Sequence, residues 1–239
     1  MKWFRLGCLI LFFAAAPLLR AQDANGQAVA ALKSGHLHTA ESILRAHLKA
    51  EPGDLVSVQL LAIVLDKEKK YAEADPFYRQ ALAAAPHSPG LLNNYGNHLL
   101  AMSKAAQAQK AFSRTLHLQP ENANALYGLA VADIAFHERQ PAMALLVRAR
   151  KQAPQRRDVA ALLARTTASL GYFGDAVAAW DAYLKLAPRD ETARRERAFA
   201  ESAIGKNQQA ALAELGHFAR THPRDAVGHY ELGTAESTA

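Results

Sequence analysis

The chain has 239 residues, half of them hydrophobic, and a formal charge of +6. Its only cysteine, Cys8, lies in an N-terminal apolar stretch. The rest of the chain can therefore form neither disulfides nor thiolate metal sites. The length would suit one or two globular domains, and the modest charge argues against a nucleic-acid-binding surface.

The N-terminus reads as an export signal. Lys2 and Arg5 precede an almost uninterrupted apolar run over residues 6–19, and Ala21 follows it. The run is shorter than the roughly 20 residues that a membrane span needs, so we expect a signal peptide over residues 1–21, cleaved after Ala21. Cleavage lowers the formal charge from +6 to +3 and leaves no stable membrane span. The predicted location is periplasmic or secreted, and an uncleaved membrane anchor is the alternative.

Prolines recur every 34 residues through most of the remaining chain. They are Pro52, Pro86, Pro120, Pro154 and Pro188. A fixed period of this length predicts stacked repeats, here six of them over residues 22–223. The repeats fall at about 21–54, 55–88, 89–122, 123–156, 157–190 and 191–225. Residues 226–239 are predicted to form a partial seventh repeat or a capping helix.

Numbering each repeat so that the proline is position 32 aligns columns of like residues. Position 20 is alanine six times: Ala40, Ala74, Ala108, Ala142, Ala176 and Ala210. Position 8 is always small: Ala28, Ala62, Gly96, Ala130, Ala164 and Ala198. Position 24 is large in five repeats: Leu44, Tyr78, Phe112, Leu146 and Trp180. Position 15 is Gly35, Gly171 or Gly205 in three repeats, where glycine ends a helix. In the sixth repeat the proline slips one place to Pro223, which implies a one-residue insertion, and Glu214 or Leu215 stands for the large residue.

These columns resemble the tetratricopeptide repeat family. The resemblance implies an all-α fold: a right-handed superhelical solenoid of antiparallel helix pairs, with a first helix over positions 1–14 and a second over positions 17–30. Pro141 falls at the third place of its helix, where no hydrogen bond is lost. Pro76 lies deeper in its helix and is predicted to bend it locally.

The resemblance also implies a concave groove, lined by positions 2, 5, 9, 12 and 13 of the first helices, that receives a peptide or protein segment. The candidate groove residues are Gln59, Lys67, Asn93, Asn97, Asn124, Tyr127, Arg165 and Arg195. Amides can pair with an extended backbone, the tyrosine can stack on a ligand, and the two guanidinium groups can grip a carboxylate. For each residue the competing interpretation is an ordinary solvated side chain of a helix.

We find no pattern that predicts catalysis, a cofactor or a metal. The ten histidines are scattered, and the closest pair, His36 and His38, is expected in a turn without carboxylate neighbours. No phosphate-binding loop or serine elbow is present. A basic run over residues 148–157 could contact nucleic acid or anionic lipid, but cations of this kind also stabilise a helix C-terminus.

The sequence therefore predicts a non-catalytic interaction scaffold in a bacterial cell-envelope assembly, with a protein or peptide partner and no nucleic acid. Two alternatives stay open. The repeats could be a docking or regulatory region of a larger enzyme truncated after residue 239. They could also be a self-associating structural protein that stacks through its unfinished seventh repeat.

Overall fold

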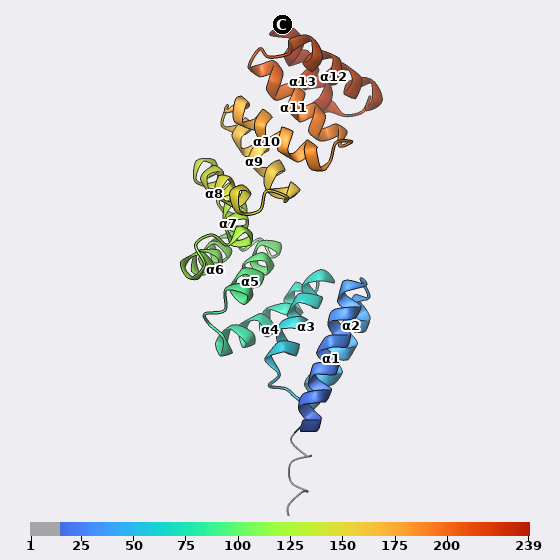
Figure 1. Cartoon of the computed structure of the whole chain (residues 1–239), viewed down its shortest axis with the longest axis vertical. Coiled ribbons are helices and arrows are strands. Elements are labelled where there is room, and N and C mark those ends of the chain that lie inside the picture. The colour runs from blue at the N-terminus through green and yellow to red at the C-terminus, as the bar shows by residue number, and fades with distance from the viewer. Residues whose placement is uncertain (1–14) are drawn as a thin grey trace, which may run out of the picture. The chain divides into compact units, whose positions relative to one another are not determined.

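A computed structural model describes the backbone of residues 15–239 and the side chains of residues 24–239. This part of the chain is all-α, as expected, with no strand (Figure 1). The helices are α1 (Ala15–Lys33), α2 (Leu37–Ala50), α3 (Leu55–Lys67), α4 (Tyr71–Ala84), α5 (Pro89–Ala101), α6 (Ala105–Leu118), α7 (Ala123–Ala135), α8 (Arg139–Gln152), α9 (Arg157–Ser169), α10 (Phe173–Leu186), α11 (Glu191–Ala203), α12 (Gln208–Thr221) and α13 (Ala226–Ser237). Most of the expected signal segment lies outside the described residues, and its last part belongs to the start of α1.

The helices divide into two compact units. The first unit ends at Lys104 and contains α1 to α5, and the second runs from Ala105 to Ala239 and contains α6 to α13. Within each unit, consecutive helices pack side by side, as Figure 1 shows for α3 with α4 and for α9 with α10. Each unit has its own buried apolar residues at its core.

The first helix of most repeats begins at a polar cap directly after the periodic proline. The side chains of Asp54, Ser88, Asn122, Asp190 and Asp225 each accept a hydrogen bond from a backbone N–H in the first turn of α3, α5, α7, α11 and α13. Such caps satisfy donors that have no partner inside the helix and contribute about 1 kcal/mol each. Proline followed by a cap therefore restarts the helix at the same point of each repeat.

The turn between the two helices of a repeat has the same backbone geometry six times. Position 15 has a positive φ at Gly35, Gly171 and Gly205, and also at Lys69, Ser103 and His137. The sequence indicated this turn most clearly where glycine stands. Three residues with side chains adopt the left-handed conformation because the helices on both sides fix the path of the chain.

The columns of small and large residues form the cores, with one correction. Position 8 is buried in all six repeats, and position 24 is buried at Leu44, Tyr78, Phe112, Leu146 and Trp180. At position 20, five alanines are fully buried, but Ala210 is exposed and Ala211 is buried in its place. The prediction for Ala210 was wrong because the one-residue insertion lies before α12, in the turn that contains Asn207, and shifts that helix by one. Leu215, fully buried, accordingly takes the large position, and Glu214 does not.

Both prolines inside second helices are accommodated. Pro141 is the third residue of α8, where its missing N–H costs nothing. The helix α4 runs from Tyr71 to Ala84 through Pro76, and its buried residues Ala74, Tyr78 and Ala81 keep one register on both sides of the proline. The packing of the apolar face therefore holds the helix together across the lost hydrogen bond.

Candidate functional site

In the first unit, the candidate groove residues differ in how far solvent reaches them. Lys67 on α3 and Asn97 on α5 are exposed, and Gln59 on α3 is half-buried. Asn93 on α5 is only 7% exposed, and its Oδ1 has no hydrogen-bond partner among the described residues. A partner could therefore reach Lys67 and Asn97 directly, whereas Asn93 belongs to the helix packing.

In the second unit, Asn124 and Tyr127 on α7 are brought together by a residue that the sequence did not single out for this surface. The guanidinium of Arg156 donates a hydrogen bond of 2.8 Å to Oδ1 of Asn124 and lies 4.8 Å from the centre of the Tyr127 ring. Arg156 also pairs with Asp158 on α9 and lowers the pKa of that carboxyl group. Burial raises the pKa of the Tyr127 hydroxyl, so this group stays a neutral hydrogen-bond donor at neutral pH.

Arg165 on α9 is exposed but already holds a carboxylate of this chain. Its Nε and Nη2 lie 3.1 Å from Oε2 and Oε1 of Glu196 on α11, a two-pronged contact. The same guanidinium lies 5.5 Å from the Trp180 ring centre. The hydrogen bonds to Glu196 raise the pKa of Arg165, so its charge is fixed at any physiological pH.

Arg195 on α11 is buried rather than open to a partner. Its guanidinium lies 2.9 Å from Glu231, 3.5 Å from Asp225 and 3.6 Å from Glu196, and 5.0 Å from the centre of the Phe218 ring. Burial raises the pKa of Glu231 to about 7, although the charge of Arg195 opposes that shift. The expectation of two guanidinium groups free to grip a partner's carboxylate therefore does not describe this chain, because both already pair with its own acids.

A pocket opens beside Arg165, between α9, α10, α11 and α13. Its volume is about 320 Å³. It is lined by Arg165, Phe173, Trp180, Glu196, Phe199 and Glu231, with small residues between them. Aromatic walls and paired charges suit the side chain of a bound polypeptide. Glu196 and Glu231 were not among the residues predicted from the sequence. The signal that could have indicated them is the spacing of acids that meet Arg165 and Arg195 across adjacent repeats.

A second cluster in the first unit surrounds the buried His98 of α5. Its Nδ1 lies 2.6 Å from Oδ1 of Asp66, and its Nε2 lies 3.6 Å from Oδ1 of Asp75. Tyr78 donates a hydrogen bond to Asp66. The rings of Tyr78 and Tyr95 both pack against the imidazole. The His98 side chain is fully enclosed, so no substrate can reach it. The cluster joins α3, α4 and α5 as a structural polar network.

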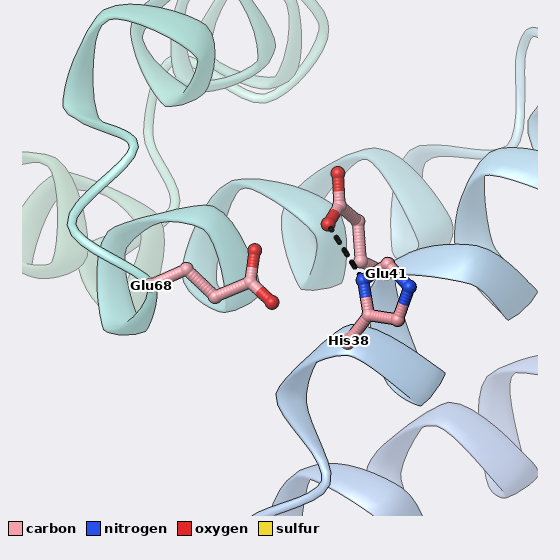
Figure 2. Close-up of side chains that lie close together, drawn as sticks. All are labelled: His38, Glu41 and Glu68. Carbon is pink, nitrogen blue, oxygen red and sulfur yellow. Dashed lines mark ion pairs between the residues drawn. The ribbon is translucent and has the colours of Figure 1, made fainter.

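Figure 2 shows His38 and Glu41 of α2 with Glu68, which follows α3, a group close enough together to hold a metal ion. The expectation that His38 lacks carboxylate neighbours was wrong, because its Nδ1 lies 3.9 Å from Glu41. Glu41 and Glu68 are already paired with a cation of the chain, however. The Lys70 ammonium lies 2.8 Å from Glu41 and 2.7 Å from Glu68, and its hydrogen bond lowers the pKa of Glu41 to about 2.

Two cations of the basic run over residues 148–157, Arg148 and Arg156, are engaged within the chain. Arg148 donates hydrogen bonds of 2.6 Å to the Pro120 carbonyl and 2.9 Å to Glu121, and Arg156 forms the contacts described above. Arg150, Lys151 and Arg157 form no hydrogen bond or ion pair with the described part of the chain.

Comparison with known proteins identifies the repeats. Residues 99–166 match the sequence profile of the tetratricopeptide repeat family. Residues 99–166 are therefore a tetratricopeptide repeat region, and the neighbouring helix pairs share its fold, as the sequence columns suggested. This repeat fold is in general one that binds proteins or peptides and is typically non-catalytic.

Solved structures share the fold at low sequence identity. The chain is similar to PilF of Pseudomonas aeruginosa (TM-score 0.79, 17% identity, 94% of this chain and 100% of that one). It is also similar to PilW, described as a type IV pilus biogenesis factor (TM-score 0.74, 22% identity, 89% and 96%). A third similar structure is YrrB, a tetratricopeptide repeat protein with an unusual peptide-binding site (TM-score 0.65, 16% identity, 78% and 96%).

A different kind of relative matches a shorter stretch. The human protein O-mannosyl-transferase TMTC3 is 32% identical over 88 residues, which are 37% of this chain. The mouse protein of the same name is also 32% identical, over 83 residues, or 35% of this chain. The chain spans about a tenth of the length of these relatives, with 10% of the human and 9% of the mouse protein covered. Within residues 15–239, none of the helices has the length and apolar character needed to cross a bilayer.

Proposed function

We propose that the chain is a non-catalytic scaffold that holds a segment of a partner protein against the first helices of its repeats. The observation that carries this proposal is the surface of α7, α9 and α11. It joins the amide of Asn124, the ring of Tyr127 and the pocket beside Arg165 within a single unit. Side chains of this kind recognise an extended backbone and its side chains, and they offer no activated nucleophile.

The partner-binding surface in this proposal consists of Asn124, Tyr127, Arg165 and the pocket between α9, α10, α11 and α13. In the first unit, Lys67, Asn97 and the half-buried Gln59 form a further exposed set. Asn93 and Arg195 support these surfaces from within the helix packing. Since Arg156, Arg165 and Arg195 are already paired, the binding energy would come from the aromatic rings, the amides and the walls of the pocket.

An envelope role is part of the proposal. It rests on the predicted signal peptide over residues 1–21, with export to the periplasm or secretion. The likeness to PilW, a type IV pilus biogenesis factor, supports a role in an envelope assembly. The test of export is the intact mass of the purified chain: a chain that begins at Gln22 supports it, and a retained Met1 in a soluble fraction contradicts it.

Site-specific crosslinking in the native host tests the binding surface. A photo-crosslinking residue replaces Asn97 or Asn124 in turn, and Lys110 or Ser113, exposed on the second helix α6, serves as the control. We expect a discrete protein adduct from the first two positions and none from the controls. The pair Asn124→Ala and Tyr127→Ala should weaken capture while the helical content stays the same. Equal crosslinking from all four positions would contradict the proposed surface.

The match to TMTC3 favours one second candidate. That stretch is a small part of a protein whose name states a transferase activity, so repeats of this kind also occur in larger enzymes. As a docking region of an enzyme, the repeats would copurify with one catalytic protein in fixed ratio. Native mass spectrometry of the complex distinguishes this from a scaffold that joins several non-catalytic proteins.

A further inference from the structure

The fourth repeat departs from the other repeats at two positions of its second helix. Position 28 is leucine in four repeats, at Leu48, Leu82, Leu116 and Leu184, and each of these leucines packs against a core. The sixth repeat, after its insertion is allowed for, has the small apolar Ala219 there. Only the fourth repeat has a charged residue, Arg150. At position 28, therefore, an apolar side chain ordinarily fills the crevice between neighbouring helices.

Position 25 changes in the opposite sense. It is Arg45, Arg79, Ser113 and Asp181 in four repeats and Gly216 in the sixth, but Val147 in the fourth. Val147 is 54% exposed. An apolar side chain is therefore turned outward where the other repeats are polar or small, and a cation is turned inward where they are apolar.

The two exchanges lie on the wall of one cavity. A cavity of about 470 Å³ opens between α8, α9 and α10, with Met143, Val147, Pro154 and Leu163 among its apolar lining. Arg150 and Lys151 lie on the α8 side, and Asp175 lies on the α10 side. The cavity is formed by the second helices α8 and α10 over α9, and none of the residues proposed above for partner binding lines it.

The guanidinium of Arg150 is the group in the cavity wall that sets which kind of ligand fits. No carboxylate among residues 24–239 pairs with it, in contrast to Arg148, Arg156, Arg165 and Arg195 on the same unit. Lys151 beside it interacts only weakly with Glu121, lowering the pKa of that acid as the least of several causes. An unpaired guanidinium next to an apolar cavity suits a ligand that carries both a carboxylate and an apolar group.

We propose that this cavity is a second partner site, which receives an apolar side chain followed by an acidic residue in a polypeptide segment. The apolar side chain enters between Val147 and Leu163, and the carboxylate pairs with Arg150. Asp175, on the opposite side, accepts a backbone N–H of the same segment. That acid disfavours a plain fatty acid, which would bring a carboxylate and no N–H donor.

The test uses the methionines of the full-length chain. The chain has three, and Met143 lines the cavity, so a chain labelled with ¹³C at the methionine methyl groups reports binding at one signal, with Met102 as an internal reference. The probes are short peptides, acetylated and amidated at their ends, with Leu-Glu, Ile-Glu, Phe-Glu or Met-Glu at the centre. Matched peptides with Gln in place of Glu, or Ser in place of the apolar residue, are the controls. We expect a saturable shift of the Met143 signal with at least one Glu peptide and at least fivefold weaker binding of its controls.

Two variants restore the residues of the other repeats and so should fold. Arg150→Leu fills the crevice as Leu116 and Leu184 do, and we expect at least a tenfold loss of affinity with unchanged or higher thermal stability. Val147→Arg, which matches Arg45 and Arg79, should weaken binding similarly. Arg157→Gln removes a nearby positive charge that does not line the cavity and should leave affinity within twofold.

Three results would overturn the proposal. One is the absence of a Met143 shift with all four Glu peptides. Another is equal binding to wild type and Arg150→Leu. The third is a shift of Met143 by dodecanoate as strong as that by the best peptide, which would assign the cavity to an anionic amphiphile. None of these results bears on the crosslinking test at Asn97 and Asn124, because the two sites share no residue.

Discussion

Gly128 of α7 lies directly against the aromatic ring of Phe112 of α6. A Cβ atom at Gly128 would lie 2.3 Å from Cζ of that ring, and Phe112 is fully buried. The close approach of these two helices therefore depends on the absence of a side chain at this one position. The ring has no room to move, since it fills the large position of the third repeat.

Gly128→Ala should accordingly destabilise the second unit, even though alanine favours helix more than glycine does. Overpacking a core costs about 1–3 kcal/mol, and the better helix propensity of alanine offsets up to about 1 kcal/mol of it. The measurement is the midpoint of urea unfolding followed by circular dichroism. Gly174→Ala, in α10 with nothing within 4 Å of the added methyl group, is the matched control and should be neutral or stabilising. A variant Gly128→Ala as stable as this control would show that the ring can shift.

His137→Gly should stabilise the same unit. His137 has a φ of 63°, where a side chain is unfavourable by about 1–2 kcal/mol and glycine is not. The greater freedom of glycine in the unfolded chain offsets part of this, so we expect a gain of about 0.5–1 kcal/mol. Thermal unfolding measures it. The reverse change at the matching position of the fifth repeat, Gly171→Ala, should destabilise, and two shifts of the same sign would refute the argument from backbone conformation.

Glu231 should make the stability of the second unit depend on pH. Burial raises its pKa from 4.5 in the unfolded chain to about 7 in the folded one. Between these values unfolding releases a proton, so the free energy of unfolding falls as the pH rises from about 4.5 to about 7 and then levels off. Glu231→Gln mimics the protonated acid, so the free energy of unfolding of this variant should not show this fall with rising pH.

The comparison of wild type with Glu231→Gln isolates this group from the other titrating residues. The two chains should be similarly stable near pH 4, and the variant should be increasingly more stable up to about pH 7. Urea unfolding across this range, recorded for both chains, gives the difference. A difference that is constant or that shrinks with rising pH would contradict the role assigned to burial.

Lys70 should keep divalent cations from the acids of α2 and α3. Its ammonium bridges Glu41 and Glu68, so the oxygens that a metal would need are already held. Adding Zn²⁺ should leave the melting temperature of wild type unchanged, and Lys70→Ala should gain a Zn²⁺-dependent rise that EDTA reverses. His38→Ala in the Lys70→Ala background should reduce that rise. Stabilisation of wild type by Zn²⁺ would show that the lysine does not block the site.

Glu41 should shift stability in the opposite sense to Glu231. The hydrogen bond from Lys70 lowers its folded pKa to about 2, below the unfolded value of 4.5. Its ionised form therefore stabilises the fold above about pH 4.5, and this contribution is lost as the pH falls toward 2. Wild type should be more stable than Glu41→Gln at pH 7, with the gap closing in acid. Unfolding curves at pH 7 and pH 3 check this, and a gap of equal size at both would count against the ion pair.

Residue types and their spacing predicted the helical repeats and most of the residues that they bury. The 34-residue spacing of Pro52 and its successors, the small residues at position 8 and the large ones at position 24 predicted a helical repeat fold. This works because packing against the next helix depends on residue size at fixed steps along the chain, and size can be read from sequence. The candidate residues Asn124 and Tyr127 were predicted from their place on the helix together with the family resemblance, and their role in binding stays a prediction.

Contacts between residues of different repeats could be seen only in the folded chain. The tertiary structure showed that Arg165 and Arg195 are held by Glu196 and Glu231, so they are not free for a partner. It placed the insertion before α12, which buries Ala211 instead of Ala210, and it showed that Arg150 lines a cavity without an acid to pair with. A charge column in the sequence does not say which partner lies within 3 Å of it, because that distance is set by how neighbouring helices pack.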